Sequence, residues 1–514
     1  MMQLSLASVL HESALRFPDR VAAIEDAREA TYRELWDGAL ARAAVLRELG
    51  VRPGDRVALL APNGIDFVTA YFGIVAAGAV VVPVAPMLVA DEIEHLVRDS
   101  GARLALAEHG CAAQLAPAVA AAGVPAVVLR DGGDDDLTTR AGDVNPLPAA
   151  VARTSEEPAV LFYTSGTTGR PKGAILSHGN LVMNCFVNAF MANEFRGDDV
   201  VLGCLPLFHT FGQTVAMNSA FLVGATVVLQ PRFDAADALA LMRRHDVNVL
   251  IGVPTMYIAL LEALGDGEPV ALRMCVSGGA PLPVAVLEAF EARFGCCVQE
   301  GYGLSETSPT ATVNQPSFGL RPGSIGHPLW GVEVEIARPE VEDRIELLGE
   351  EQLGEIVIRG HNVFAGYHGL PEATAAALVD GWFRTGDLGV KDADGFRHVI
   401  DRKKDMILRG GYNVYPREVE EALARHPQVE QVAVVGVPHP THGEEVLAVV
   451  VARARAAGED PLTAEELIAW AAERVARHKR PRLVAFAGSL PLGPSRKVLK
   501  RELRAQYAHL GEAP

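Results

Sequence analysis

The sequence predicts an α/β protein with two domains. Its 514 residues exceed what one ordinary hydrophobic core accommodates. Apolar segments of strand length alternate with segments of helix length from residue 56 to residue 277, which predicts α/β layers built on parallel sheet. Beyond residue 323, short segments alternate with a period of two, which predicts a small β-rich subdomain with antiparallel or mixed pairing. We therefore expect a large multi-sheet amino-terminal domain and a small α+β carboxyl-terminal domain.

A charged run marks the expected boundary between these domains. Residues 401–405 read DRKKD and end the large region, and a compact α+β segment follows. We place the amino-terminal domain at residues 1–402 and the carboxyl-terminal domain at residues 403–514.

The first third of the chain alternates between helices and strands. Residues 4–49 show helical periodicity, and Thr31 with Glu34 predicts a capped helix start. The acidic, Ala-rich stretch from residue 132 to about residue 155 has little pattern and predicts a surface connection. Strands are expected at residues 56–60, 80–84 and 104–107, and helices at residues 64–78 and 90–100.

A second α/β layer is expected after residue 158. Residues 158–163 are apolar and change abruptly to glycine and hydroxyl residues, where a buried strand should break into a loop. A helix is expected from Asn180 onward. Further strands are expected at residues 173–177, 200–205, 225–229, 247–253 and 274–277, and, in the β-rich subdomain, at residues 332–336 and 354–359.

Composition excludes several classes of protein. The chain is 49% hydrophobic and 21% charged, as in globular proteins, and its net charge of −18 argues against nonspecific nucleic-acid binding. The six cysteines lack metal-ligand spacing and the density of a disulfide scaffold, which predicts reduced thiols in a cytoplasmic protein. No signal peptide or transmembrane segment is expected, because charges and prolines interrupt the apolar runs.

Residues 163–173, YTSGTTGRPKG, have the character of a phosphate-binding loop. Glycines let the backbone approach a phosphate, hydroxyl and N–H groups donate to its oxygens, and Lys172 adds a positive charge. This is not a Walker-type loop, because Gly173 rather than a hydroxyl residue follows Lys172. A flexible surface loop is the alternative for this string taken alone.

Three further strings follow in order and identify a family. They are GYGLSETSP at residues 301–309, GWFRTGDLG at residues 381–389, and the run at 401–405 with GGYNV at 410–414. In this order the four strings resemble the core motifs of the adenylate-forming superfamily, which includes acyl- and aryl-CoA synthetases, beetle luciferases and peptide-synthetase adenylation domains. The resemblance extends from about residue 4 to residue 503.

The resemblance implies an enzyme, an acyl-CoA synthetase. Such enzymes join a carboxylate to the α-phosphate of ATP, release pyrophosphate, and pass the acyl group to a thiol. ATP, Mg²⁺ and coenzyme A are therefore the expected cofactor and substrates. Because negative charge develops in both steps, catalysis should come from positioning and from positive charge around the phosphates.

The resemblance also implies which residues contact ATP and the metal. Glu306 and Thr164 would hold Mg²⁺, Asp387 would accept the ribose hydroxyls, and Arg402 would reach the ribose or a phosphate. The adenine would lie between Tyr302 with Gly303 and the segment Gly279-Ala280. The loop that holds the pyrophosphate would consist of Thr164, Ser165, Gly166, Thr167, Thr168 and Lys172.

Two lysines of the carboxyl-terminal domain have expected roles by the same resemblance. Lys497 would stabilise the charge that migrates during adenylation, and Lys404 would be the hinge about which the mobile small domain rotates. The chain departs from the family at Arg496, where glycine is usual, and this affects the expected placement of Lys497.

The acyl pocket is expected to be apolar. His209, in PLFHTFG at residues 206–212, would act in catalysis by gating this pocket. An uncharged site favours a hydrocarbon tail and disfavours a second carboxylate, and the absence of aspartate in Phe211-Gly212-Gln213 disfavours amino acids. The expected pocket residues are Phe211, Thr214, Met256, Val276 and Gly278, with Gly279 and Gly303 beside them.

A medium- or long-chain fatty acid is the favoured substrate, and an aryl or cinnamate-type acid is the alternative. The chain ends at Pro514 with no fused carrier domain, which favours free coenzyme A over a carrier protein as acceptor. Loading of a separate carrier protein, a nonenzymatic nucleotide-binding role and a homodimer stay open.

Overall fold

The computed structural model describes residues 4–164, 171–453, 461–493 and 498–512. The chain divides into two compact units. Unit 1 comprises Met1–Leu282, Val286–Val334 and Ile358–Phe383, and unit 2 comprises Pro283–Ala285, Glu335–Val357 and Arg384–Pro514. The boundary predicted between residues 402 and 403 differs from this division and stays a prediction. Within the described ranges, no helix is both long enough and apolar enough to cross a membrane.

The first sheet of unit 1 contains the strands expected around residues 56–107 and 158–177. Its strand order is β6-β5-β3-β4-β7-β8; the pairs from β6 to β7 are parallel, and β7 and β8 are antiparallel. The parallel sheet predicted from alternating strands and helices is confirmed. The strands are β3 (Arg56–Leu60), β4 (Val80–Val84), β5 (Ala102–Ala107), β6 (Ala126–Val128), β7 (Pro158–Thr164) and β8 (Lys172–Ser177).

The second sheet of unit 1 has the order β15-β14-β13-β12-β11-β9-β10-β1-β2. Neighbouring strands from β13 to β10 are parallel, so their carboxyl ends lie at one edge of the sheet. The strands are β1 (Val21–Glu25), β2 (Arg28–Thr31), β9 (Val200–Gly203), β10 (Thr226–Leu229), β11 (Val249–Gly252), β12 (Met274–Ser277), β13 (Val298–Gly303), β14 (Thr310–Val313) and β15 (His327–Pro328).

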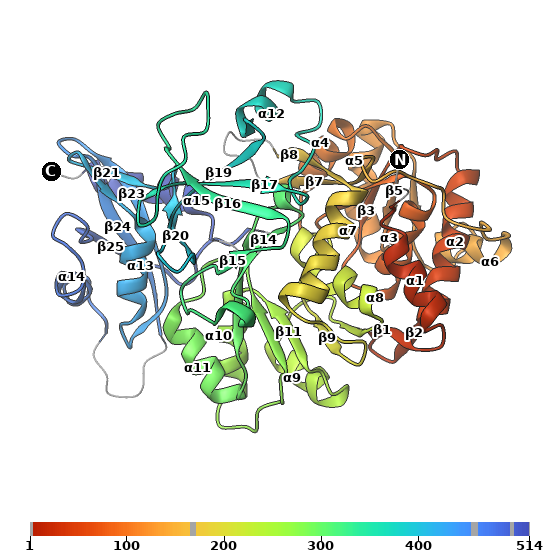
Figure 1. Cartoon of the computed structure of the whole chain (residues 1–514), viewed down its shortest axis with the longest axis horizontal. Helices are drawn as coiled ribbons and strands as arrows, with labels where there is room; N and C mark the ends of the chain where they lie inside the picture. Colours follow the sequence, from red (N-terminus) through yellow and green to blue (C-terminus); the bar gives the residue numbers. More distant parts are fainter. Residues whose placement is uncertain (1–3, 165–170, 454–460, 494–497, 513–514) are drawn as a thin grey trace. The chain divides into compact units, whose positions relative to one another are not determined.

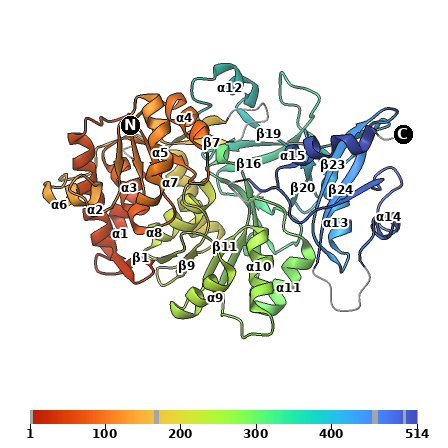
Figure 2. The ribbon, with the colours of Figure 1, turned by 180° about the vertical axis from the view of Figure 1, so that it is seen from behind.

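Helices cover both sheets of unit 1, and α9 and α10 lie beside β11 in both views (Figures 1 and 2). The capping box predicted for Thr31 is confirmed, since its side chain accepts from the Glu34 amide and Glu34 accepts from the Thr31 amide. The helices are α1 (Ser8–Arg16), α2 (Tyr32–Glu48), α3 (Ile65–Ala76), α4 (Ala90–Asp99), α5 (His109–Ala122), α6 (Leu137–Asp143), α7 (His178–Val187), α8 (Ser219–Val223), α9 (Ala235–Arg244), α10 (Pro254–Leu264), α11 (Val284–Phe294) and α12 (Pro371–Ala377), with π-helical η1 (Asn188–Ala192) and η2 (Phe211–Asn218) and 3₁₀-helical η3 (Ser305–Thr307) and η4 (Pro316–Phe318).

Two expectations for unit 1 are wrong. The helical periodicity predicted for residues 4–49 is interrupted by the hairpin β1–β2, which turns at Asp26 with a φ of 54° and pairs with β10. The stretch from residue 132 to about residue 155 contains helix α6 instead of only a surface connection. Leu137 in α6 is fully buried, so long-range packing orders a segment whose local pattern is weak.

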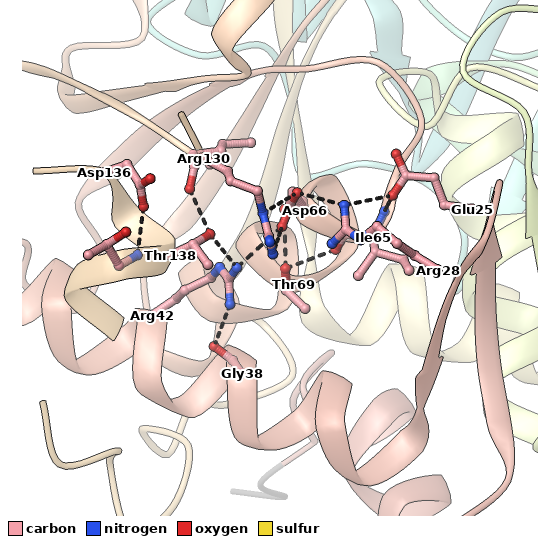
Figure 3. Close-up of polar contacts among 12 residues, drawn as sticks. Glu25, Arg28, Gly38, Arg42, Ile65, Asp66, Thr69, Arg130, Asp136 and Thr138 are labelled. Carbon is pink, nitrogen blue, oxygen red and sulfur yellow. Dashed lines mark hydrogen bonds and ion pairs between the residues drawn. The ribbon is translucent and has the colours of Figure 1, made fainter. Parts of the chain in front are cut away.

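An ion-pair cluster around Asp66 explains how α6 is held (Figure 3). The buried Arg42 of α2 donates from Nη2 to Thr138 Oγ1 at 2.8 Å and lies 3.4 Å from Asp66 Oδ1. Arg130 donates from Nε to Asp66 Oδ2 at 3.0 Å. Burial lowers the pKa of Arg42 to about 10, and the Asp66 carboxylate opposes this shift. One carboxylate of α3 therefore connects α2 with the segment that leads into α6.

Two smaller sheets follow. In the first, whose order is β16-β17-β19-β18 with β20 on β19, the pairs β18–β19 and β19–β20 are antiparallel, as the period of two predicts. In the second, β24 lies between β23 and β21, and the expected α+β character of the carboxyl-terminal segment is confirmed. The elements are β16 (Val332–Ala337), β17 (Gly354–Gly360), β18 (Leu378–Val379), β19 (Trp382–Lys391), β20 (Arg397–Arg402), β21 (Ile407–Arg409), β22 (Tyr412–Val414), β23 (Val429–His439), β24 (Gly443–Ala452), β25 (Leu483–Phe486), α13 (Pro416–Ala424), α14 (Ala464–Ala472), α15 (Lys500–Tyr507) and η5 (Ala508–Glu512).

Candidate active site

The carboxyl ends of the parallel strands in unit 1 gather several predicted site residues. His209 and Phe211 follow β9, Met256 follows β11, and Gly278 follows β12. Tyr302 lies at the end of β13. Because the strands from β9 to β13 run in one direction, these residues lie along one edge of the sheet. Ligands of open α/β sheets bind at this kind of edge.

Close contacts show that the strand ends converge. A Cβ atom added to Gly278 would lie 3.1 Å from the Phe211 ring carbon Cζ and 3.2 Å from the Gly301 carbonyl oxygen. The Thr210 and Ser305 hydroxyl oxygens are 3.4 Å apart. Little free space is therefore left where the ends of β9, β12 and β13 and the segments that follow them meet.

The segment at the end of β13 requires glycine. A Cβ atom on Gly303 would lie 1.8 Å from the Pro309 carbonyl oxygen, which no side chain tolerates. The Leu304 amide donates to that oxygen at 3.1 Å and closes the turn that carries Glu306. Gly279 adopts a φ of 80°, which favours glycine, and Ala280 beside it is exposed. Tyr302 is half-buried next to this turn in sequence.

Glu306 lies between the two sheets of unit 1. Its Oε1 accepts a hydrogen bond of 2.9 Å from the Tyr367 hydroxyl and lies 3.4 Å from Thr164 Oγ1, at the carboxyl end of β7. The backbone carbonyl of Glu306 accepts a hydrogen bond of 2.9 Å from the Phe364 amide. Burial and the neighbouring Glu306 carboxylate raise the pKa of Tyr367, so its hydroxyl stays a donor. Thr164 and Glu306, which are far apart in sequence, are thus neighbours.

Lys172 lies opposite Thr164, because the two residues pair in register at the end of β7 and the start of β8. Its Nζ lies 5.2 Å from the centroid of the Tyr367 ring, within the range of a cation–π contact. The structure therefore places Thr164, Lys172 and Glu306 around Tyr367. The remaining predicted loop residues Ser165, Gly166, Thr167 and Thr168 lie outside the described residues.

Sequence reasoning missed Tyr367. The residue reaches the site because the segment around it pairs with β8: the Ile175 amide donates to the Gly366 carbonyl at 3.0 Å, and the His368 amide donates to the Gly173 carbonyl at 2.7 Å. Tyr367 and Glu306 are 61 positions apart, and no local pattern connects them. Only the tertiary pairing brings the two side chains together.

The residues expected to line the acyl pocket divide into two groups. Phe211 and Gly278 are in contact, as described above. Thr214, Met256 and Val276 are buried, and the Met256 sulfur lies 3.9 Å from the Cys204 sulfur. His209 is half-buried, and its Nδ1 accepts from the Phe211 amide at 3.3 Å. These contacts do not test the predicted acyl-binding roles, which stay predictions.

In unit 2, Asp387 and Arg402 are register partners on β19 and β20. Arg402 Nε lies 3.1 Å from Asp387 Oδ1. The Asp387 side chain is largely buried, whereas that of Arg402 is 45% exposed. An acceptor carboxylate and a cation expected to contact the nucleotide thus lie together in this unit.

A buried ion pair holds the backbone next to Asp387. The Arg384 guanidinium donates from Nε and Nη2 to Glu355 Oε2 at 3.1 and 2.6 Å, and the Gly386 amide donates to Glu355 Oε1 at 3.0 Å. The Asp387 amide donates to Thr385 Oγ1 at 3.0 Å. Two charge-assisted hydrogen bonds to one carboxylate oxygen fix the orientation of Glu355, and its other oxygen fixes the Gly386 amide. Glu355 was missed from the sequence, because it lies 31 positions from the amide that it accepts from.

The two predicted lysines of the carboxyl-terminal region differ in what the structure shows. Lys404 lies in the turn after β20, and its carbonyl accepts from Arg504 Nη1 at 3.4 Å. Lys497 and Arg496 lie outside the described residues. The hinge and catalytic roles of these lysines therefore stay predictions.

Comparison with known proteins decides the family. A model of AMP-binding enzymes matches residues 10–368, and a model of the AMP-binding enzyme C-terminal domain matches residues 418–497. The chain belongs to the AMP-binding enzyme family. The resemblance to adenylate-forming enzymes that the four sequence strings indicate is therefore confirmed.

Several relatives of this AMP-binding enzyme are similar over nearly their whole length. A feruloyl-CoA synthase from Amycolatopsis is 39% identical over 93% of this chain and 94% of its own. A long-chain-fatty-acid–CoA ligase from Bacillus subtilis is 35% identical over 97% of this chain and 94% of its own. The crystal structure of ATP-bound MatB from Rhodopseudomonas palustris matches with a TM-score of 0.90 and 33% identity, over 99% of this chain and 100% of that one. The predicted fold class is confirmed.

The Glu355–Arg384 pair yields a prediction about local stability. Replacing Glu355 by Gln should lower the free energy of local unfolding by about 3–5 kcal/mol, because Arg384 is left buried without a carboxylate. Hydrogen exchange of the backbone at residues 384–388 should speed up accordingly, measured by mass spectrometry on the native protein.

The matched control is Glu333→Gln. Glu333 pairs with Arg359 at 2.7 Å, and both side chains are largely exposed. This substitution should change local exchange little, because water solvates the freed arginine. Equal exchange rates in the two variants would contradict the orienting role of Glu355.

Proposed function

We propose that this AMP-binding enzyme activates a medium- or long-chain fatty acid with ATP and then transfers the acyl group to coenzyme A. At the level of reaction class it is an acid–CoA ligase, which its family and its CoA-ligase relatives at 35 and 39% identity support. The observation that carries the proposal is the grouping of Thr164, Lys172 and Glu306 beside the converging strand ends at Gly278. That grouping combines phosphate-binding chemistry with an apolar neighbourhood.

The preference for a fatty acid rests on the acyl-side residues. Phe211, Thr214, Met256, Val276 and Gly278 carry no charge, and the last four are buried. Burying a hydrocarbon tail against such residues is favourable, whereas a second carboxylate would lose its hydration without a partner. The long-chain-fatty-acid–CoA ligase among the relatives supports the same class.

An aryl or cinnamate-type acid is the second candidate. The observation that favours it is the feruloyl-CoA synthase at 39% identity, which exceeds the identity to the long-chain ligase. An aromatic ring could also pack against Phe211, the aromatic member of the acyl-side residues.

The residues around Glu306 fit a magnesium ion. Mg²⁺ prefers oxygen ligands, and the Glu306 carboxylate with the Thr164 hydroxyl supplies them 3.4 Å apart. When bound, the ion would neutralise charge on the phosphates. Tyr367 donates to the same carboxylate oxygen and so would orient Glu306 toward the ion. We assign Tyr367 a positioning role.

The remaining contacts to ATP follow the family assignment. Lys172 with the loop residues 165–168 would hold the pyrophosphate by charge and hydrogen bonds. Tyr302 and Gly303 with Gly279 and Ala280 would enclose the adenine. Asp387, whose backbone Glu355 and Thr385 hold, would accept the ribose hydroxyls, and Arg402 would reach the ribose or a phosphate.

The chemical step would depend on Lys497. Its ammonium group would bind the attacking carboxylate and the phosphoryl oxygens together, and so stabilise the charge that moves between them. His209 would gate entry of the acyl chain, and Lys404 would act as the hinge for the second half-reaction. Free coenzyme A is the proposed acceptor; a carrier protein, a homodimer and a cytoplasmic location stay predictions.

A panel of acids tests this proposal. Fatty, aryl and dicarboxylic acids are incubated with the whole protein, ATP and Mg²⁺, and pyrophosphate release is measured with and without coenzyme A. Medium- and long-chain fatty acids should give the highest kcat/KM and an acyl-CoA product, and dicarboxylic acids the lowest, because the acyl-side residues are uncharged. Faster turnover of cinnamate-type acids would favour the second candidate, and no release with any acid would overturn the enzymatic proposal.

A lysine substitution tests the assignment of Lys497. Lys497→Ala should lower the rate of adenylation about a hundredfold or more, because it removes a charge that acts on the transition state. Transfer of a supplied acyl-adenylate to coenzyme A should stay largely intact. Arg501→Ala, which removes a nearby exposed charge, is the control and should leave both rates close to wild type. Equal loss of both half-reactions in Lys497→Ala would contradict the assignment.

The positioning role of Tyr367 has its own test. Tyr367→Phe should raise the Mg²⁺ concentration for half-maximal pyrophosphate release by about tenfold, because outer partners orient metal ligands. The rate at saturating Mg²⁺ should fall less. Tyr163→Phe is the matched control, since the Tyr163 hydroxyl also donates to a carboxylate, that of Asp99, at 2.7 Å. An unchanged Mg²⁺ dependence in Tyr367→Phe would refute this role.

A further inference from the structure

Two thiols lie in contact between adjacent strands of unit 1. Cys275 is in β12, and Cys296 lies in the turn that leads into β13. The strands are parallel neighbours, and Cys275 pairs in register with Val298, two residues after Cys296. The two sulfur atoms are 3.5 Å apart. All six cysteines of the chain are free thiols in this structure.

The two thiols differ in access and in acidity. Cys275 is fully buried, Cys296 is half-buried, and the adjacent Cys297 is exposed. The Cys275 thiol donates its hydrogen bond to the Cys296 sulfur, and this bond lowers the pKa of Cys296. Burial, by contrast, raises the pKa of Cys275, and the Glu291 carboxylate raises both. The more accessible sulfur is therefore the better nucleophile.

We propose that Cys275 and Cys296 form a reversible disulfide when the protein encounters a hydroperoxide. In the first step the Cys296 sulfur attacks the outer peroxide oxygen, the O–O bond breaks, and the products are a sulfenic acid on Cys296 and an alcohol, or water from hydrogen peroxide. The sulfur is oxidised by two electrons and the peroxide is reduced by two.

In the second step the Cys275 sulfur attacks the Cys296 sulfur. An S–S bond forms, the S–O bond breaks, and the leaving hydroxide takes the Cys275 proton to become water. Two thiols and one hydroperoxide thus yield one disulfide, one alcohol and one water. A dithiol reverses the reaction by thiol–disulfide exchange.

The positions of the two sulfur atoms suit the formation of a disulfide. The sulfur atoms must approach from 3.5 Å to a bond length of about 2.05 Å, a change that side-chain rotation and a small shift of the turn can supply. Cys296 lies in a turn, which yields more readily than a strand. The buried position of Cys275 favours its role as the resolving thiol, because it meets the oxidised Cys296 before solvent thiols do. The modification requires only these two sulfur atoms and is independent of the proposed ligase reaction.

Mass spectrometry of the whole protein tests the inference. The protein is treated with hydrogen peroxide, the remaining thiols are alkylated, and trypsin then separates residues 274–293, which contain Cys275, from residues 294–344, which contain Cys296 and Cys297. A single cross-linked species, two hydrogens lighter than the sum of the two peptides, is expected and should disappear after treatment with dithiothreitol. Cys297→Ser should give the same link, because the exposed neighbour is not the partner.

Two further variants decide between outcomes. Cys296→Ser should abolish the link, and Cys275→Ala should instead leave a sulfenic acid on Cys296 that dimedone captures. Cys204→Ala, a change at another buried cysteine, is the control and should preserve the link. A link that survives in Cys296→Ser through Cys297, or overoxidation of Cys296 in the wild type without any link, would overturn the proposal.

Discussion

The carboxylate of Glu306 is the point on which the candidate site depends. It lies in a short turn after β13, beside the carboxyl end of β7, and accepts a hydrogen bond from Tyr367. Three segments that are distant in sequence therefore meet at one buried acid, and two of them contribute oxygen atoms suited to a hard cation. A buried carboxylate without such donors would be strongly disfavoured, so the site also constrains how the two sheets pack.

Close packing at the strand ends explains two glycines, Gly303 of the motif and Gly278 after β12. A Cβ atom on Gly303 would collide with the Pro309 carbonyl, whereas one on Gly278 would be in tight contact with the Phe211 ring and the Gly301 carbonyl. Short distances between strand ends leave little free space where these segments meet. On the proposed acyl side the constraint is one of shape and apolar contact, whereas on the proposed phosphate side it is one of charge. Substrate choice and chemistry can thus vary separately in this family of folds.

In unit 2, hydrogen bonds to the backbone position the carboxylate of Asp387. Asp387 is held by its backbone, because Glu355 accepts from the Gly386 amide and from Arg384 at once. A buried ion pair of this kind contributes little net stability, because the loss of hydration offsets the attraction between the charges. Removing one partner is nevertheless costly, because it leaves an uncompensated buried charge. The cysteine pair between β12 and β13 is also a product of strand packing, and it adds chemistry that the ligase reaction does not require.

The sequence by itself determined the alternation of strands and helices, the capped start of α2 and the family, and it supplied the residues proposed to contact phosphate and metal. These follow from local periodicity and from motifs whose residues are close in the chain. Tertiary structure decided the hairpin β1–β2, helix α6, and the partners Tyr367, Glu355 and Cys296. Each of these depends on contact between segments tens to hundreds of residues apart, as with Tyr367 and Glu306 at 61 positions, or Ala23 of β1 and its register partner Val227 of β10. Long-range packing of this kind leaves no periodic signal in the local sequence.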